Sequence, residues 1–502
     1  MTGLTAFPMP FHTTRSRSSQ SPRTLRELQI TQCSAHIRAK PDWFDKRNDA
    51  GIVARWTREA VAQGLTEAEV AYVLAELAHY AALRDGRTGI EVSAVDGVWQ
   101  SDRLVDDKLG SRLREAVRVL EQVPEADLDW HPGSDGQVLD LVHPSLFCLV
   151  REVSGAPDRA WHNPTNRYAQ YEFSDTFQWL PTDVDMSADG DVSFRSYVNN
   201  VHPENHHELA AVLPDLFARV RPLFEKVLTD LRHPRPLRIE VDPYGWYDSE
   251  PEYPDESSFA DDAAYAEAVE TWEEAYDAWC ENRRPAVPDA PAFVAPQLPD
   301  EESAVDLRGR RLQVIVKLAT LHLTPDKPEY TGGSWHVEGM LNERIVSTAL
   351  YYWDSENITE SRLSFRTALD EPDYEQSDHT GMREVYGLEN EGALNQTLGS
   401  ASTPAGRCLA FPNVLQHRVG SFRLVDPARP GHRKILAFFL VDPSERIVST
   451  SDVPPQQPWA ETSTMTLEQA KGFREQLMRE RKFFVDENNE QLYEREFSLC
   501  EH

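Results

Sequence analysis

One short stretch of this sequence constrains the fold more than any other. Within the run from Tyr330 to Gly339, His336 and Glu338 are separated by a single residue. Residues two apart in an extended chain point to the same face, so this imidazole and this carboxylate converge on one point. Gly332 and Gly333 allow a close approach of the backbone, at an entropic cost that a plain strand has no reason to carry. The stretch therefore predicts a ligand-binding strand end.

A third group of the same kind occurs much later in the chain. His417 follows the apolar segment from Cys408 to Phe411 and should open another strand. Two histidines and one carboxylate form the 2-His-1-carboxylate triad that binds non-haem Fe(II). An isolated His-x-Glu pair is more often an exposed strand edge. The glycines and the distal histidine favour a metal site at His336, Glu338 and His417.

Apolar, β-branched segments surround these three residues and predict a β-rich core. The expected strands lie near residues 312–323, 345–353, 362–368, 407–411, 417–425 and 433–441. A cation, Arg433, begins the last of them, and a guanidinium can bind a carboxylate through two parallel hydrogen bonds. Arg433 lies 16 residues after His417, which leaves room for one strand, a turn and a return. Arg423 ranks second because it would share the strand of His417.

His-x-Glu, a distal His and a later Arg resemble the Fe(II)/2-oxoglutarate-dependent dioxygenases of the double-stranded β-helix (jelly-roll) fold. The chain resembles the DUF4246 family more closely, over residues 120–459. Glu338 departs from the wider oxygenase pattern, in which Asp is commoner. The phrases that carry the family resemblance are Leu323-Thr324-Pro325, Gly332 to Gly339, Asn357-Ile358-Thr359, Gly431 to Pro443, Trp130 to Ser134, Leu141 to Leu146 and Ser196 to Pro203.

The resemblance implies an α+β fold: a double-stranded β-helix core, an N-terminal helical layer and supporting helices. It also implies an oxygenase that uses Fe(II), 2-oxoglutarate and O2, with His336, Glu338 and His417 as metal-binding and catalytic residues. In such enzymes the keto acid occupies two of the remaining iron positions and O2 occupies the third. Arg433, or Arg423 in second place, would bind the distal carboxylate of 2-oxoglutarate.

The substrate is less constrained than the metal site, and a small molecule or a peptide is expected. The pocket candidates sit on or beside the metal-bearing strands: Trp335, Asn342, Glu343, Tyr352 and Lys317. Tyr352 is at least as well explained as a core aromatic residue. Two alternatives keep the same barrel: a non-catalytic cupin-like metal-binding or sensor protein, and a metal-dependent hydrolase or isomerase. Arg433 argues against the non-catalytic alternative, because a metal-only site needs no buried cation.

Composition shifts along the chain predict its organisation. A capping box at Thr66-x-x-Glu69 begins one helix, and an amphipathic helix over 207–231 is expected to break near Pro214 or Pro222. Asp129 to His143 could hold a second metal, but its Pro and Gly residues favour a turn-rich loop. The expected regions are a disordered tail or transit peptide (1–30), helices (31–125), strands and a helix that support the core (126–241), an acidic insertion (242–306), the metal-binding core (307–460) and a C-terminal helix (461–502).

The charge of the chain is concentrated in one segment. Residues 242–306 contain nineteen acidic residues against two basic ones, within a chain of net charge −32. A lid over the pocket mouth would favour a cationic substrate, whereas a solvated acidic surface is the simpler interpretation. The net charge argues against nucleic acid and anionic membrane as partners.

Five scattered cysteines favour reduced thiols and a cytoplasmic location. The C-terminal helix could support a homodimer.

Overall fold

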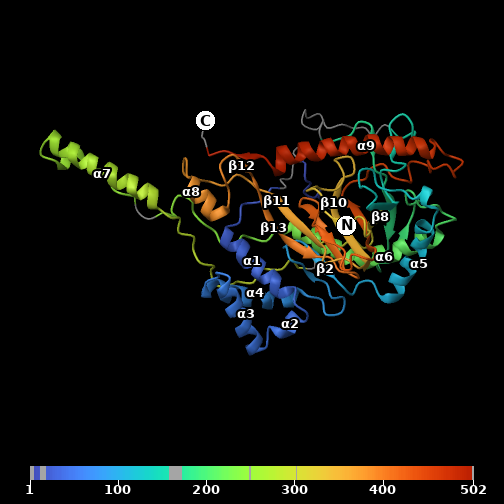
Figure 1. Cartoon of the computed structure of the whole chain (residues 1–502), viewed down its shortest axis with the longest axis horizontal. Coiled ribbons are helices and arrows are strands. Elements are labelled where there is room, and N and C mark those ends of the chain that lie inside the picture. Colours follow the sequence, from blue (N-terminus) through green and yellow to red (C-terminus); the bar gives the residue numbers. More distant parts are fainter. Residues whose placement is uncertain (1–4, 12–18, 158–171, 248–249, 301, 500–502) are drawn as a thin grey trace.

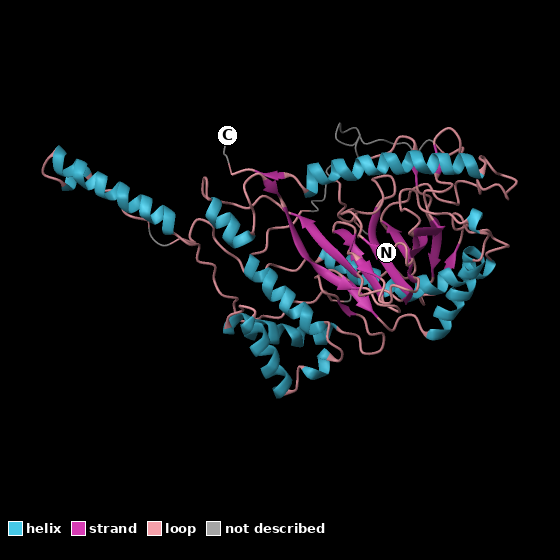
Figure 2. Ribbon diagram, viewed as in Figure 1, coloured by secondary structure: helices cyan, strands magenta, loops and turns pink. Residues whose placement is uncertain are grey.

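The computed structural model describes residues 5–11, 19–157, 172–247, 250–300 and 302–499 of the chain. Antiparallel strands form the body of the molecule, and helices surround them (Figures 1 and 2). Among the helices of these residues, none combines the length and apolar character that crossing a membrane requires. Four cysteines, Cys33, Cys148, Cys280 and Cys408, are unpaired, and Cys500 lies outside the described residues.

The larger sheet is antiparallel throughout and has the strand order β1-β2-β14-β10-β17-β8-β6-β7, with β3 paired to β8. Its long central strands, β10, β17 and β8, come from the region predicted as the core. The strands are β1 (Glu91–Val92), β2 (Trp99–Ser101), β3 (Val138–Val142), β6 (Thr182–Met186), β7 (Val192–Phe194), β8 (Arg311–Leu323), β10 (Ile345–Glu356), β14 (Cys408–Pro412) and β17 (Gly431–Val441). The turn between β6 and β7 contains the dipeptide Asp189-Gly190, with Gly190 at a φ of +92°, a conformation that glycine adopts without strain.

A second sheet faces the first. It consists of β13 (Asn395–Ser402), β11 (Arg362–Ala368) and β15 (Gln416–Val419), and β9 (Glu329–Tyr330) pairs with β16 (Phe422–Arg423). One buried cluster contains Phe365 of β11 and Leu398 of β13 together with Tyr352 of β10 and Phe411 of β14. The two sheets therefore enclose a common apolar interior. Two further strand pairs are β4 (Leu149–Val150) with β5 (Phe177–Gln178) and β12 (Gly392–Ala393) with β18 (Glu496–Phe497).

Helices cover the outer face of the larger sheet. The longest, α6 (His207–Arg232), buries ten residues and continues unbroken through Pro214 and Pro222, contrary to the predicted break. Phe217 of α6 packs edge-on against Phe438 of β17, with ring centroids 5.5 Å apart. The other helices are α1 (Leu25–Arg38), α2 (Trp43–Lys46), α3 (Ala50–Ala62), α4 (Glu67–Leu83), α5 (Asp107–Glu121), α7 (Asp262–Asn282), α8 (His379–Gly381) and α9 (Leu467–Asn488), with short 3-10 or π turns at Glu125–Asp127, Glu256–Ser258, Met382–Tyr386 and Asn489–Tyr493.

Residues 5–11, which belong to the segment predicted as a disordered tail, pack against the rest of the molecule. Phe7, Met9 and Phe11 are buried, and the backbone N–H of Phe7 donates to Asp442. Helix α1 already begins at Leu25, capped by Thr24. Apolar residues spaced two apart explain this difference, since an extended strap can bury them without regular structure. Residues 1–4 and 12–18 of the predicted tail lie outside the described residues.

The acidic insertion forms α7, which has no buried residue. Figure 1 shows this helix projecting away from the body of the molecule, and α9 lying along the sheets. The placement of α7 therefore does not support a lid over the predicted metal site.

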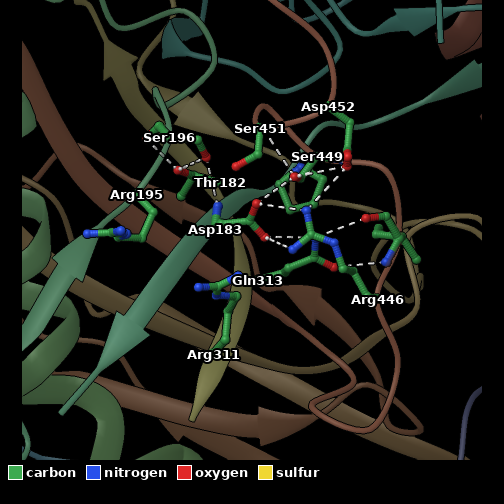
Figure 3. A network of polar contacts seen from close by, with 12 residues as sticks. Thr182, Asp183, Arg195, Ser196, Arg311, Gln313, Arg446, Ser449, Ser451 and Asp452 are labelled. Atoms are coloured by element: carbon green, nitrogen blue, oxygen red, sulfur yellow. Dashed lines mark hydrogen bonds and ion pairs between the residues drawn. The ribbon is translucent and has the colours of Figure 1, made fainter. Parts of the chain in front are cut away.

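A polar network fixes the segment after β17 to the larger sheet (Figure 3). The buried carboxylate of Asp183 in β6 accepts hydrogen bonds from Arg446 at 3.1 and 3.2 Å, from Ser449 at 2.8 Å and from Gln313 of β8 at 3.1 Å. Ser449 also contacts Asp452. The buried Asp183 carboxylate thus accepts hydrogen bonds from three side chains, one in β8 and two in the segment after β17.

Candidate metal centre

The backbone brings the two predicted histidine ligands together. His336 lies between β9 and β10, and His417 lies in β15. The two residues form an antiparallel bridge, in which the N–H of His336 donates to the carbonyl of His417 at 3.2 Å and the reciprocal bond is 3.0 Å long. Their rings consequently lie side by side, with centroids 4.3 Å apart. This pairing continues the β9–β16 contact and extends the second sheet.

Glu338 completes a compact group of three donors. Its Oε1 lies 3.3 Å from Nε2 of His417 and 3.9 Å from Nε2 of His336. One ligand atom from each of the three residues lies within 4.8 Å of the other two. A single metal ion could contact all three, because metal–nitrogen and metal–oxygen bonds are ~2.0–2.2 Å long.

The protonation states at this site suit a cation. Nδ1 of His336 donates to the carbonyl of Ser334 at 2.9 Å, which leaves the lone pair of Nε2 free. Burial and the neighbouring His417 lower the pKa of His336 to about 4. Burial by itself would raise the pKa of Glu338, but the hydrogen bond from His417 and the nearby positive groups, Lys317 included, lower it to about 2. At neutral pH the site therefore presents a carboxylate beside a neutral imidazole.

Asn413, which the sequence reasoning missed, fastens the segment that carries Glu338. Its side-chain oxygen accepts the backbone N–H of Glu338 at 2.8 Å, and its amide donates to the carbonyls of Glu338 at 2.9 Å and Ile345 at 3.0 Å. Asn413 is fully buried. One feature of the sequence could have indicated this role: Asn413 directly follows the strand that ends at Pro412 and precedes His417 by four residues.

The glycine before the triad has the role that the sequence suggested. Gly332 has a φ of +99°, and a Cβ there would lie 3.0 Å from the carbonyl oxygen of Val419. The next amide, that of Gly333, donates to the same carbonyl at 3.0 Å. Only glycine adopts this conformation without strain at so close an approach.

Arg433 is a fully buried cation in β17. Its Nη2 donates to Oγ1 of Thr403 at 3.2 Å, whereas Nε and Nη1 have no hydrogen-bond partner among the described residues. The guanidinium carbon lies 4.6 Å from the ring centre of Tyr352. Burial lowers the pKa of Arg433, although a guanidinium remains charged in proteins.

Arg423, the second-ranked candidate, is exposed in β16 and donates its backbone N–H to Thr359. The strand expected over 417–425 is divided between β15 and β16, so Arg423 does not continue the strand of His417. Of these two arginines, only Arg433 is buried.

Three of the predicted pocket residues have structural partners. Trp335 lies close to two guanidinium groups, with Cζ of Arg366 at 4.9 Å and Cζ of Arg418 at 4.6 Å from its ring centre. Asn342 exchanges two hydrogen bonds with the backbone of Ser174. Glu343 is fully buried and accepts from the amides of Trp179 and Met340 and from Arg481. These contacts position the wall of the site.

A chamber of about 280 Å³ opens beside the triad and includes His336 and Glu338 in its lining. Its apolar walls include Phe11 of the N-terminal strap, Trp179, Met340 and Phe484 of α9. Arg481 of α9 also lines it and stacks 3.7 Å from the ring centre of Trp179. The sequence reasoning missed the residues from both chain ends, because only tertiary packing brings them to the site.

A second cluster, His131, Asp140 and His143, also places three ligand atoms within 4.8 Å of one another. Its hydrogen bonds favour a polar network over a metal site. Nδ1 of His143 accepts the backbone N–H of Ser145 at 3.2 Å, so the neutral ring carries its proton on Nε2. Nδ1 of His131 lies 2.8 Å from Asp140, which has Arg474 3.9 Å away. Burial and the charge of Lys317 hold the pKa of His143 well below its usual range.

The chain belongs to the DUF4246 family. The model of the family described as "Protein of unknown function (DUF4246)" matches residues 67–463, and that of its N-terminal domain matches residues 2–59. This confirms the resemblance seen in the sequence. No match was found among curated proteins.

Several solved structures share weak similarity with the chain. They include the Fe(II)/(alpha)ketoglutarate-dependent dioxygenase TqaL (10% identity, 68% of this chain and 93% of that chain, TM-score 0.23) and the dioxygenase for auxin oxidation (DAO) in rice (13%, 74% and 79%, 0.25). IDO from Bacillus thuringiensis is 11% identical, with a TM-score of 0.17. The match covers 27% of this chain and 47% of that protein, so it spans less than half of that protein's length. All these TM-scores are below 0.5, so the similarities define neither the fold nor the activity of this chain.

Proposed function

We propose that this protein is an Fe(II)- and 2-oxoglutarate-dependent oxygenase with a double-stranded β-helix core. The observation that carries the proposal is the combination of a His336, Glu338 and His417 triad with a buried, incompletely paired Arg433. With iron bound, O2 would be the oxidant, and its two oxygen atoms would be divided between the oxidative decarboxylation of 2-oxoglutarate and the oxidation of a substrate C–H bond.

Two imidazoles and one carboxylate are the donor set of non-haem Fe(II) sites, and they leave part of the coordination sphere open. The chain contributes positioning: the His336–His417 bridge aligns both rings, and Asn413 holds the backbone of Glu338. The apolar walls beside the triad would exclude water from the reacting atoms.

Arg433 supports 2-oxoglutarate as the co-substrate. A buried charge without a partner costs several kcal/mol, so a guanidinium with two unpaired nitrogens calls for an anion. A carboxylate can accept two parallel hydrogen bonds from such a group. A cupin-like protein that only bound metal would have no use for this cation, and neither would a hydrolase acting through metal-bound water.

The strand order supports the proposed fold class. Strands β8, β17, β10 and β14 lie next to one another in the larger sheet, and β15, β11 and β13 lie opposite them. From β10 onward the strands of these two sheets alternate along the chain: β10, then β11 and β13, then β14, then β15, then β17, while β12 and β16 belong to separate two-stranded pairs. That alternation is what a double-stranded β-helix requires.

The test is calorimetry without O2. Mn(II)-loaded protein should bind one equivalent of 2-oxoglutarate, and the metal-free protein should bind it far more weakly. Arg433→Met should weaken binding by ~10–100-fold, on the order of 1.5–3 kcal/mol. Arg423→Met removes an exposed cation from a neighbouring strand and serves as the matched control. His336→Ala or His417→Ala should remove tight metal binding. Metal-independent binding of 2-oxoglutarate, or equal losses in both arginine variants, would refute the proposal.

A further inference from the structure

Lys317 occupies a distinctive position on β8. In that strand Ile315 packs in one apolar cluster with Ile345, Ala437, Phe439 and Trp179. Side chains two residues apart in a strand share a face, so Lys317 points to the same interior side. Its register partner in β17 is Ala437, which belongs to that cluster. The half-buried Lys317 side chain therefore lies on the same interior side as Trp179, which also lines the chamber.

Lys317 and Arg433 are separate cations on one interior surface. Arg433 pairs in register with Leu321, four residues farther along β8 than Lys317. At ~3.3 Å per residue, that spacing corresponds to ~13 Å along the strand. When 2-oxoglutarate binds to Arg433, Lys317 therefore remains available to a second ligand.

The ammonium of Lys317 makes no hydrogen bond or ion pair with another residue in the described part of the chain. Its cationic neighbours differ in this respect. Arg481 donates to Glu343 at 2.7 Å, and Arg474 donates two hydrogen bonds to Asp129. Glu172, an acidic group of the chamber wall, has an interaction of its own.

The charges of the loaded site leave Lys317 unbalanced. This step rests on the proposed function. The two carboxylates of 2-oxoglutarate and Glu338 would neutralise Fe(II) and Arg433 together. Lys317 would then have no opposite charge of its own, and poor solvation makes an unpaired charge costly. An additional anion would remove that cost.

We propose that the prime substrate is a small organic acid whose carboxylate pairs with Lys317 while its apolar body lies in the chamber. Trp179, Met340 and Phe484 provide apolar contact for that body, and about 280 Å³ accommodates a molecule the size of an amino acid side chain or a short acyl chain. The net charge of −32 does not oppose this, because exposed charges are screened within ~10 Å at 0.1 M salt, whereas the lysine contact is direct.

The test compares three probes of one length: hexanoate, hexylamine and hexanol. Each is added without O2 to protein loaded with Mn(II) and saturating 2-oxoglutarate, and the paramagnetic relaxation of the probe protons is measured by NMR. Hexanoate should show strong relaxation and the amine and alcohol little. In Lys317→Met the hexanoate affinity should fall at least tenfold, and Lys317→Arg should restore much of it. Lys482→Met, which removes an exposed lysine from α9, should leave it unchanged.

The outcomes separate this inference from the proposed function. Failure of Mn(II) or 2-oxoglutarate to bind would refute the proposed function itself. If both bind, absence of hexanoate binding, equal binding of hexylamine, or full hexanoate affinity in a folded Lys317→Met protein would refute only the substrate class. A loss of 2-oxoglutarate affinity in Lys317→Met as large as that in Arg433→Met would instead assign Lys317 to the co-substrate and overturn the inference.

Discussion

At the scale of single residues, the proposed metal centre depends on groups that would not contact the metal. Glu338 reaches His417 because its backbone is held on both sides by one buried amide, that of Asn413. His336 keeps a free Nε2 because Ser334 accepts the proton on its other nitrogen. Supporting partners of this kind commonly change metal affinity by ~10–100-fold when removed.

Asn413→Ala is predicted to weaken metal binding by ~10–100-fold and to lower the free energy of unfolding by about 2–3 kcal/mol, since it leaves buried backbone groups unpaired. Calorimetric titration with Mn(II) and urea unfolding check the two effects. Asn357→Ala is the matched control, because the Asn357 side chain likewise bonds to the backbone, donating to three carbonyls, but follows the opposite end of β10. Equal metal affinity in the two variants would contradict the role assigned to Asn413.

At the scale of elements, hydrophobic pattern predicted the interior strands well and the sheet edges poorly. Strands β8, β10, β11, β14 and β17 agree with the expected ranges within a few residues, because buried strands must be apolar. Strand β13 was not predicted, because its sequence is polar and contains glycine. It is an edge strand that pairs with β11, and it is defined by its backbone hydrogen bonds and not by an apolar pattern of side chains. Helix α6 stays intact through two prolines because tertiary burial outweighs the lost backbone bonds.

The predicted site followed the same division. The triad could be predicted because ligand chemistry dictates residue type and spacing, and the structure brings those three side chains together. Asn413, Phe11 and Arg481 could not be predicted, because an asparagine, a phenylalanine or an arginine has many ordinary roles. Only tertiary packing places these residues at the site.

Asp183→Asn is predicted to destabilise the connection between β6 and the segment after β17 by about 1–3 kcal/mol, because it removes the charge that three donors share. Urea unfolding measures the change. Asp185→Asn, two residues along the same strand, affects more exposed ion pairs with Arg195 and Arg311 and should cost less than ~1 kcal/mol. A loss at Asp185 as large as that at Asp183 would refute the assignment.

Asp230, in the last turn of α6, is predicted to make stability depend on pH. Burial raises its pKa to about 6, although Trp99 donates a hydrogen bond to it at 2.8 Å. Between the ordinary pKa of 3.8 and the folded-state pKa of about 6, the folded protein keeps the proton on Asp230 and the unfolded chain does not. The contribution of Asp230 to the free energy of unfolding therefore falls as the pH rises from about 4 to 6. Asp230→Asn should therefore exceed the wild type in stability by about 1–2 kcal/mol at pH 7. Urea unfolding near pH 4 should show this advantage lost; an equal advantage at both pH values would contradict the account.

At the scale of the whole molecule, the two chain ends close the site and the acidic arm stands apart from it. Phe11 from the N-terminal strap and Phe484 from α9 both line the chamber. Helix α7, which carries seven of the nineteen acidic residues of the insertion, projects from the body instead (Figure 1). The charge of α7 is therefore a property of the surface, whereas Lys317 and Arg433 are cations of the interior between the sheets.

Replacing residues 251–278 by a short Gly-Ser linker is predicted to leave Mn(II) and 2-oxoglutarate affinities within about twofold of wild type, because α7 buries no residue and its charges are screened beyond ~10 Å. Calorimetry at low and high salt measures both affinities. A marked fall in either affinity, or a changed salt dependence, would show that the arm acts on the site.

The central claim is that 2-oxoglutarate binds directly to iron held by His336, Glu338 and His417. The most direct measurement is anaerobic titration of the Fe(II)-loaded protein with 2-oxoglutarate, monitored by the visible charge-transfer absorption of a keto acid chelated to Fe(II). We predict that the band appears in the wild type and in Arg423→Met, needs ~10–100-fold more 2-oxoglutarate in Arg433→Met, and is absent in His336→Ala. No band in wild-type protein that demonstrably holds one Fe(II) would contradict the account.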